Sequence, residues 1–103
     1  MIEQDDAGRA VVRLSGEIDV ANADRIPQLV VEAAAEAPAG VVLDMSGVTF
    51  IDSTGIGAMI AARNACLSSG RSLQIAAPSR QVQRMLALTG LDDVFAVVGP
   101  ARC

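Results

Sequence analysis

The fold of this chain follows from one stretch, Asp44-Met-Ser-Gly-Val-Thr-Phe-Ile-Asp-Ser-Thr-Gly-Ile-Gly57. It begins at the end of an apolar run, Val41 to Met45, and is apolar again over Val48 to Ile51. Short polar residues, Asp52-Ser-Thr-Gly55, then precede a run of mostly helix-forming residues, Ile56 to Leu67. Because Asp, Ser and Thr are preferred residues at helix N-caps, the stretch predicts a buried strand, a turn rich in hydroxyl groups, and a helix.

Strand patterns alternate with helix patterns on both sides of this stretch. Strands are predicted at Met1–Gln4, Arg9–Ser15, Val41–Met45, Ser72–Ala77 and Val94–Val98. Helices are predicted from Asn22 or Asp24 to Ala37, from Thr54 or Gly55 to Ser69, and from the N-cap Ser79 to Gly90. Of the two candidate caps for the first helix, Pro27 favours Asp24, since proline is tolerated only in the first turn.

Two further turns are expected within this pattern. Gly16-Glu-Ile-Asp19 should end or bend the second strand, and Ser46-Gly47 should form a turn before Val48–Ile51, a short extended or helical segment. The alternation predicts an α/β domain with a mainly parallel sheet. Since the turns that follow parallel strands share one edge of a sheet, Asp19 and Ser53 are expected to lie close together.

Composition limits the classes of protein that remain. At 103 residues the chain is expected to be one domain, residues 1–103, and 51% apolar residues argue against disorder. Phe50 and Phe95 are the only aromatic residues, so the core must be aliphatic. A net charge of −4 argues against binding to nucleic acid. No apolar run approaches the ~18 residues that cross a membrane, and no signal peptide is evident, so a cytoplasmic protein with no membrane partner is expected.

Enzymatic chemistry is poorly supported by the residues present. There is no histidine or lysine, and Cys66 and Cys103 have no second ligand at metal-binding spacing, which excludes a Cys/His zinc site and a Cys–His nucleophile. Gly-x-Ser-x-Gly and phosphate-loop motifs are absent. A magnesium or acid–base cluster of Asp19, Asp44 and Asp52 is the alternative, but a satisfied polar residue at Asp44 and turn or cap roles for the other two are favoured. No catalytic residue, metal or cofactor is therefore expected.

Two motifs make the chain resemble a known family. Ser15-Gly-Glu-Ile-Asp19 and Val42-Leu-Asp-Met-Ser-Gly-Val-Thr-Phe-Ile-Asp-Ser-Thr-Gly-Ile-Gly57, with Arg84-Met-Leu-Ala-Leu-Thr-Gly-Leu91 near the end, resemble a STAS domain of the anti-sigma factor antagonist type. The resemblance covers essentially the whole chain. It implies a mixed, mainly parallel sheet of four to five strands with helices packed mostly on one side. Two departures are an N-terminal strand shorter than usual and Pro27 early in the first helix.

The resemblance also implies a partner-switching role. In that family the unphosphorylated antagonist binds an anti-sigma factor that is itself a serine kinase, and so releases the sigma factor. The kinase phosphorylates the serine of the Asp-Ser motif, which corresponds to Ser53, and a PP2C-type phosphatase restores the active form. Thr54 remains as an alternative phosphoacceptor. The partner-binding residues expected from this resemblance lie in the Asp52–Gly55 turn and beside it: Asp19, Asp52, Ser53, Thr54, Gly55, Ile56 and Gly57.

Two other functions stay open from the sequence. The first is a STAS subunit of another assembly, such as a stress-signalling complex or a lipid or anion transporter, in which Ser53 is only a cap and a contact. The second is a small hydrolase or nucleotide-binding domain that uses the three carboxylates. The glycines Gly55 and Gly57 favour a binding surface, because each costs about 1 kcal/mol relative to alanine inside a helix and small residues let another protein approach.

Overall fold

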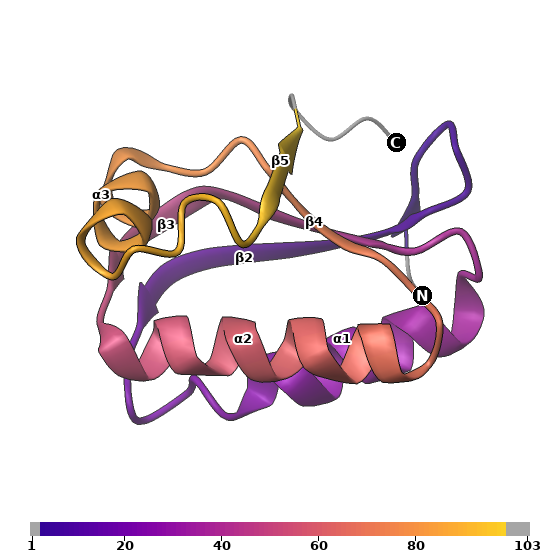
Figure 1. Ribbon diagram of the computed structural model, residues 1–103, viewed down its shortest axis with the longest axis horizontal. Coiled ribbons are helices and arrows are strands. Elements are labelled where there is room, and N and C mark those ends of the chain that lie inside the picture. The colour runs from indigo at the N-terminus through magenta and orange to yellow at the C-terminus, as the bar shows by residue number, and fades with distance from the viewer. Residues whose placement is uncertain (1–2, 99–103) are drawn as a thin grey trace.

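The computed structural model describes residues 3–98, in which five strands form one sheet in their order along the chain, β1-β2-β3-β4-β5 (Figure 1). The strands are β1 (Glu3–Gln4), β2 (Ala10–Ile18), β3 (Val41–Ile51), β4 (Leu73–Ala76) and β5 (Ala96–Val98). β1 pairs antiparallel with β2, and the other three pairings are parallel. The predicted α/β class with a mixed, mainly parallel sheet is confirmed. Met1 and Ile2, which the first predicted strand included, lie outside the described residues.

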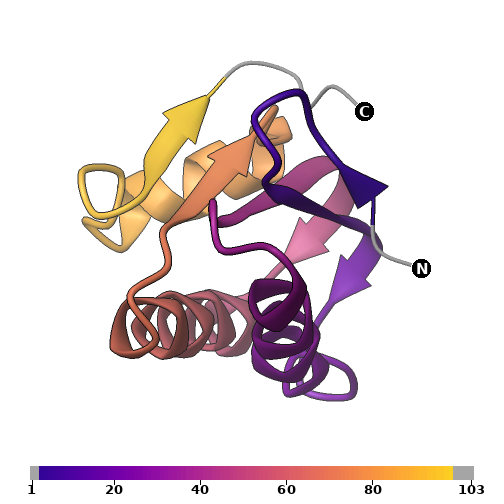
Figure 2. The same ribbon diagram turned by 90° about the vertical axis from the view of Figure 1, so that its right-hand side faces the viewer.

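Three helices connect the parallel strands: α1 (Arg25–Glu36), α2 (Ser53–Ser68) and α3 (Arg80–Leu88). α1 and α2 lie side by side and cover one face of the sheet, whereas α3 lies at the end of the sheet where β2 and β3 terminate (Figures 1 and 2). Sequential strand order with helical crossovers places α1 and α2 on the same face, because such crossovers are right-handed. None of the helices in this part of the chain is long and apolar enough to cross a membrane.

The core lies between β3 and the two helices and is aliphatic, as the composition predicts. Val41, Leu43 and Met45 of β3 are fully buried, and Met59 and Ala62 of α2 are fully buried as well. A largely apolar run such as Val41–Met45 is typical of a strand that is covered on both faces. Strand β3 therefore lies at the centre of the hydrophobic core.

Strand β3 is longer than predicted, and the expected turn at Ser46-Gly47 is wrong. Arg13 pairs with Asp44 and Ser15 with Gly47, so two residues of β3 lie opposite the single residue Leu14 of β2. This is a β-bulge, in which an extra residue is accommodated without ending the strand. A Cβ on Gly47 would lie 3.0 Å from the Cβ of Ser15, so glycine permits the close approach of the two strands there.

Strand β2 also continues past its expected end. Gly16 adopts a φ of 76°, which bends the strand, but pairing with β3 resumes and reaches the pair Ile18 and Ile51. On the other side of β3, β4 pairs only as far as Asp44. The N–H of Ser79 then donates to the carbonyl of Met45, 3.3 Å away, so the start of α3 takes the place of β4. The last residues of β2 and β3 thus project together at one end of the molecule.

Candidate functional site at the start of helix α2

Asp19 and the Asp52–Gly55 turn lie side by side because strands β2 and β3 end in register. Ile18 pairs with Ile51, and the N–H of Asp52 donates to the carbonyl of Ile18, 3.4 Å away. Asp19 follows directly after β2, and Ser53 begins α2, the helix that follows β3. The expectation that Asp19 and Ser53 share one edge of the sheet is confirmed.

Asp52 is the residue that starts α2. Its backbone is extended, and its Oδ1 accepts a hydrogen bond from the N–H of Gly55 at 3.0 Å. Its carbonyl accepts from the N–H of Ile56 at 3.0 Å. The helix therefore begins at Ser53 rather than at Thr54 or Gly55, because the carboxylate rather than a hydroxyl provides the N-cap.

The hydroxyl of Ser53 is exposed and unused. Within residues 3–98, neither Ser53 nor Thr54 makes a hydrogen bond through its side chain or its backbone N–H. Some other hydroxyls of the domain are engaged: that of Ser46 donates to Asp44 at 2.8 Å, and that of Ser79 accepts from Val82. Asp52 performs the capping, so the hydroxyl of Ser53 takes no part in holding the turn.

Gly55 has a structural role that the sequence did not reveal. An added Cβ would lie 2.6 Å from Cγ1 of Ile51 and 2.9 Å from Cγ2 of Ile18, so only glycine lets the first turn of α2 approach both strand ends. Gly55 itself is buried, and Ile56 is 3% exposed. Gly55 and Ile56 therefore pack inward, beneath the predicted contact surface, and are not part of it.

Gly57 presents the opposite environment. It is exposed, and an added Cβ would meet no other atom within 4 Å. No packing in the described residues requires glycine there. It lies on the surface one turn of helix from Ser53, so it stays in the predicted contact surface together with Asp19, Asp52, Ser53 and Thr54.

The loop that carries Asp19 is fixed by Asn22. The side-chain amide of Asn22 donates to the carbonyl of Glu17 at 2.8 Å, and its oxygen accepts from the N–H of Asp19 at 3.1 Å. Oδ1 of Asp19 in turn accepts from the N–H of Ala21. Asn22 is therefore not the cap of α1, which begins after Asp24, although Asp24 makes no side-chain cap hydrogen bond. The sequence does not reveal that the side chain of Asn22 holds this loop closed.

The three carboxylates of the alternative cluster each accept hydrogen bonds from different partners. Asp44, 7% exposed, accepts hydrogen bonds from the guanidinium of Arg13 at 2.6 Å and from Ser46. Asp52 caps α2, and Asp19 closes its own loop. Among the described residues, no three acidic, cysteine or histidine side chains are grouped as metal ligands would be. The favoured roles of these residues, a satisfied polar group, a cap and a turn, are confirmed.

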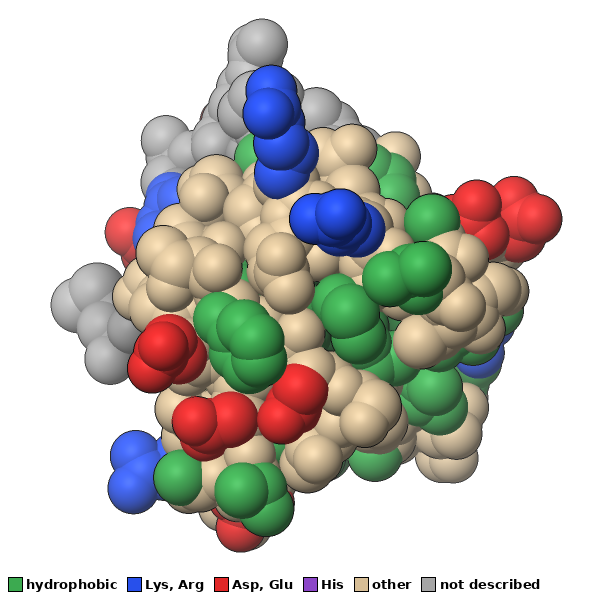
Figure 3. Space-filling view, turned by 90° about the vertical axis from the view of Figure 1, so that its left-hand side faces the viewer, with side chains coloured by type: hydrophobic (Ala, Val, Ile, Leu, Met, Phe, Trp, Pro, Cys, Tyr) green, Lys and Arg blue, Asp and Glu red, His purple; other side chains and the backbone are tan. Residues whose placement is uncertain are grey.

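The end surface of the molecule, where β2 and β3 stop, combines apolar and charged groups. Figure 3 shows this end, on which acidic side chains lie among apolar ones in the lower half and arginine or lysine side chains lie above them. Since the chain has no lysine, these basic groups are arginines. The described part of this surface therefore lacks the continuous basic patch that a nucleic-acid interface requires (Figure 3).

Comparison with known proteins identifies relatives of the whole domain. A family model described as the STAS domain matches residues 1–101. A relative from Mycobacterium tuberculosis, the anti-sigma-F factor antagonist RsfB, is 31% identical over 91 residues, which cover 88% of this chain and 74% of that protein. The crystal structure of an anti-sigma factor antagonist from Mycobacterium paratuberculosis superposes with a TM-score of 0.76 at 33% identity and covers 94% of this chain and 81% of that one.

The same fold occurs in a protein of another class. A sulfate transporter family protein from Wolinella succinogenes superposes with a TM-score of 0.71 at 24% identity, covering 84% of this chain and 73% of that chain. At that identity the likeness concerns the fold alone.

Proposed function

Because the chain belongs to the STAS domain family, we propose that it is an anti-sigma factor antagonist controlled at Ser53. Unphosphorylated, it binds an anti-sigma factor that is a serine kinase, and the sigma factor is released. Transfer of phosphate to Ser53 ends that binding, and a PP2C-type phosphatase reverses it. The protein acts by binding rather than by catalysis, and it acts in the cytoplasm, where sigma factors meet RNA polymerase.

One observation carries this proposal: the Ser53 hydroxyl is exposed and without a hydrogen bond at the first residue of α2, while Asp52 does the capping. Aspartate is as good an N-cap as serine, and a serine that caps a helix uses its oxygen to accept a backbone hydrogen bond. Here the cap is supplied one residue earlier, so modification of Ser53 removes no hydrogen bond within the described residues. A kinase can therefore reach the hydroxyl without unfolding the turn.

The fold is suited to tolerate the phosphate. A phosphoserine carries about −1.5 to −2 charges at neutral pH. At the start of a helix it meets the positive end of the helix dipole, worth roughly 0.3–1 kcal/mol, and the N–H groups of Ser53 and Thr54 are without acceptors in the described residues. The carboxylates of Asp19 and Asp52 oppose this by repulsion. The expected net effect on stability is small.

An interface over Ser53 does not tolerate the phosphate. Closing a partner surface over a doubly charged group removes its water, and an uncompensated buried charge costs several kcal/mol. Each 1.4 kcal/mol lowers affinity about tenfold, so one phosphate is enough to separate the two proteins. The same modification therefore leaves the antagonist folded and abolishes its contact.

A phosphorylation assay tests the proposal. Each kinase-type anti-sigma factor encoded in the source genome is purified and incubated with the antagonist and ATP, and the product is mapped by mass spectrometry. We expect one of them to add a single phosphate to Ser53. Ser53→Ala should receive none and Thr54→Ala should be labelled like the wild type. Labelling of Ser53→Ala, or phosphate on Thr54 in the wild type, would overturn the assignment of the site.

One other function remains as the second candidate, a STAS subunit of a transport assembly without phosphorylation at Ser53, since the STAS fold also occurs in a sulfate transporter family protein. A pull-down with the tagged chain distinguishes the two. Recovery of transporter subunits with no kinase would favour this second function, whereas recovery of an anti-sigma factor supports the first.

A further inference from the structure

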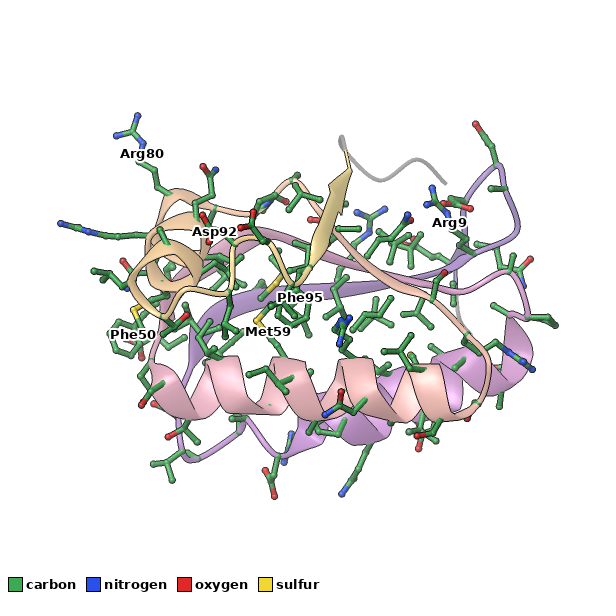
Figure 4. All side chains as sticks on the ribbon, viewed as in Figure 1. Arg9, Phe50, Met59, Arg80, Asp92 and Phe95 are labelled. Carbon is green, nitrogen blue, oxygen red and sulfur yellow. The ribbon has the colours of Figure 1, made fainter. Side chains whose placement is uncertain are left out.

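The side chain of Phe50 lies at the end of the molecule where helix α2 begins (Figure 4). It projects between α3 and the start of α2, at the end of the molecule where β2 and β3 stop (Figure 4). It lies three positions before Ser53 in the sequence, two residues before the cap Asp52. Its side chain is therefore part of the same end of the molecule as the proposed phosphorylation site.

Phe50 is the one aromatic side chain among the large apolar groups that are exposed in residues 3–98. The chain has only two phenylalanines; Phe95 is 3% exposed, whereas Phe50 is 42% exposed. The neighbouring residue Ile51 is fully buried, so the strand end is anchored without Phe50. Its cross-strand partner in the β2–β3 register is Glu17, which is also exposed and carries a charged end group.

We propose that Phe50 is the apolar anchor by which this chain docks on its anti-sigma factor, and that the anti-sigma factor receives the ring in an apolar pocket. Aromatic side chains are enriched at the centres of protein interfaces, where they are fully desolvated. Val20, 78% exposed in the loop after β2, adds a second apolar group to the same end. This inference rests on the proposed function, since it names the feature of the partner that the Ser53 surface meets.

The occupant follows from continuity with Ser53 and from the logic of the switch. A phosphate separates two proteins most effectively when the contact around it excludes water, because only then is its hydration lost on closing. In a wet, polar contact the phosphate would keep its water and would have little effect. An apolar anchor beside Ser53 therefore makes the modification incompatible with binding, and the partner that seats Phe50 is the one that phosphorylation releases.

The test measures affinity in solution. The purified kinase-type anti-sigma factors of the source genome are loaded with ADP, so that no phosphate is transferred, and titrated with wild type, Phe50→Ala, Phe50→Leu and Leu67→Ala. Leu67 is the matched control: it is 52% exposed, and it lies on α2 about 20 Å along the helix axis from Ser53. We expect Phe50→Ala to bind at least about tenfold more weakly, Phe50→Leu to be intermediate, and Leu67→Ala to bind like wild type.

The outcomes separate the inference from the proposed function. Melting temperatures of all variants confirm that each is folded. If wild type binds an anti-sigma factor and Phe50→Ala binds it equally well, the anchor is overturned while the proposed function stands. If no anti-sigma factor binds wild type, the proposed function fails and the inference fails with it. A third outcome is that wild type sediments as a dimer and Phe50→Ala as a monomer, with the same affinity for the anti-sigma factor. In that case the ring packs against a second copy of the chain and the inference is overturned.

Discussion

Gly55 and Gly57 are two glycines of the same helix turn that should respond oppositely to alanine. At Gly55 the new methyl group would meet side chains of two different strands, 2.6 Å from Ile51 Cγ1 and 2.9 Å from Ile18 Cγ2. Both contacts are with β-branched side chains, which are stiff at χ1 and cannot swing aside freely. At Gly57 the methyl group would meet no atom within 4 Å.

The expected magnitudes follow from these contacts. Overpacking costs about 1–3 kcal/mol, and two contacts under 3.0 Å place Gly55→Ala toward about 3 kcal/mol. Replacing glycine by alanine in a helix returns about 1 kcal/mol, which leaves a net loss near 2 kcal/mol at Gly55 and a gain near 1 kcal/mol at Gly57. For a domain of this size, 1 kcal/mol shifts the melting temperature by about 4–8 °C.

Urea unfolding and thermal melts of both variants measure the difference. We expect Gly55→Ala to melt roughly 8–16 °C below wild type and Gly57→Ala to melt about 4–8 °C above it. Gly57→Ala should nevertheless bind the anti-sigma factor less well, because its methyl group lies in the proposed contact surface. Equal stability of the two variants would refute the explanation that Gly55 exists to seat α2 against the strand ends.

Three further predictions concern single groups. Asp52→Ala should lose about 1 kcal/mol of stability and Asp52→Asn little, since asparagine caps a helix equally well; urea denaturation compares them, and an Ala variant as stable as wild type would refute the cap. Burial alone would raise the pKa of Asp5, but hydrogen bonds from Arg9 and Ala7 outweigh it and lower that pKa. The stabilisation of wild type over Asp5→Asn should therefore be present above the ordinary pKa of 3.8 and be lost as the pH falls through the lowered value, and acid titrations of both proteins that run parallel would contradict this. Burial raises the pKa of the Cys66 thiol, so in a Cys103→Ser background iodoacetamide at pH 8 should label Cys66 only after denaturation; rapid labelling of the native protein would contradict its burial.

The alternation of elements and the motif residues were accessible from sequence because they depend on local chemistry. Cap residues such as Ser79, apolar runs such as Val41–Met45 and the constraint from Pro27 act on neighbours within a turn or a strand. The common edge shared by Asp19 and Ser53 followed from a general rule of parallel sheets. These features need no knowledge of which side chains meet.

The features that the sequence does not reveal depend on which groups meet once the strands are paired and the loops are closed. Ser46-Gly47 has the composition of a turn, and only the pairing with β2 shows that it is a bulge. A Cβ on Gly55 would meet Ile51, four residues before it, and Ile18 on the neighbouring strand, so the need for glycine there depends on how the two paired strand ends lie against the helix. Asn22 suits a cap as well as a loop clamp, and the choice depends on where the carbonyl of Glu17 points. Phe50 falls in Val48–Ile51, which the sequence predicts only as an extended or helical segment, so neither its place in strand β3 nor its exposure follows from the sequence.

The central claim is that one phosphate on Ser53 controls the contact with the anti-sigma factor. The direct test is a titration of the ADP-loaded anti-sigma factor with two preparations of the antagonist, unmodified and quantitatively phosphorylated, each verified by mass spectrometry and by its melting temperature. The account predicts that both preparations are folded with similar melting temperatures and that the phosphorylated one binds at least about tenfold more weakly. Equal affinity of the two preparations, with the phosphate confirmed on Ser53, would contradict it.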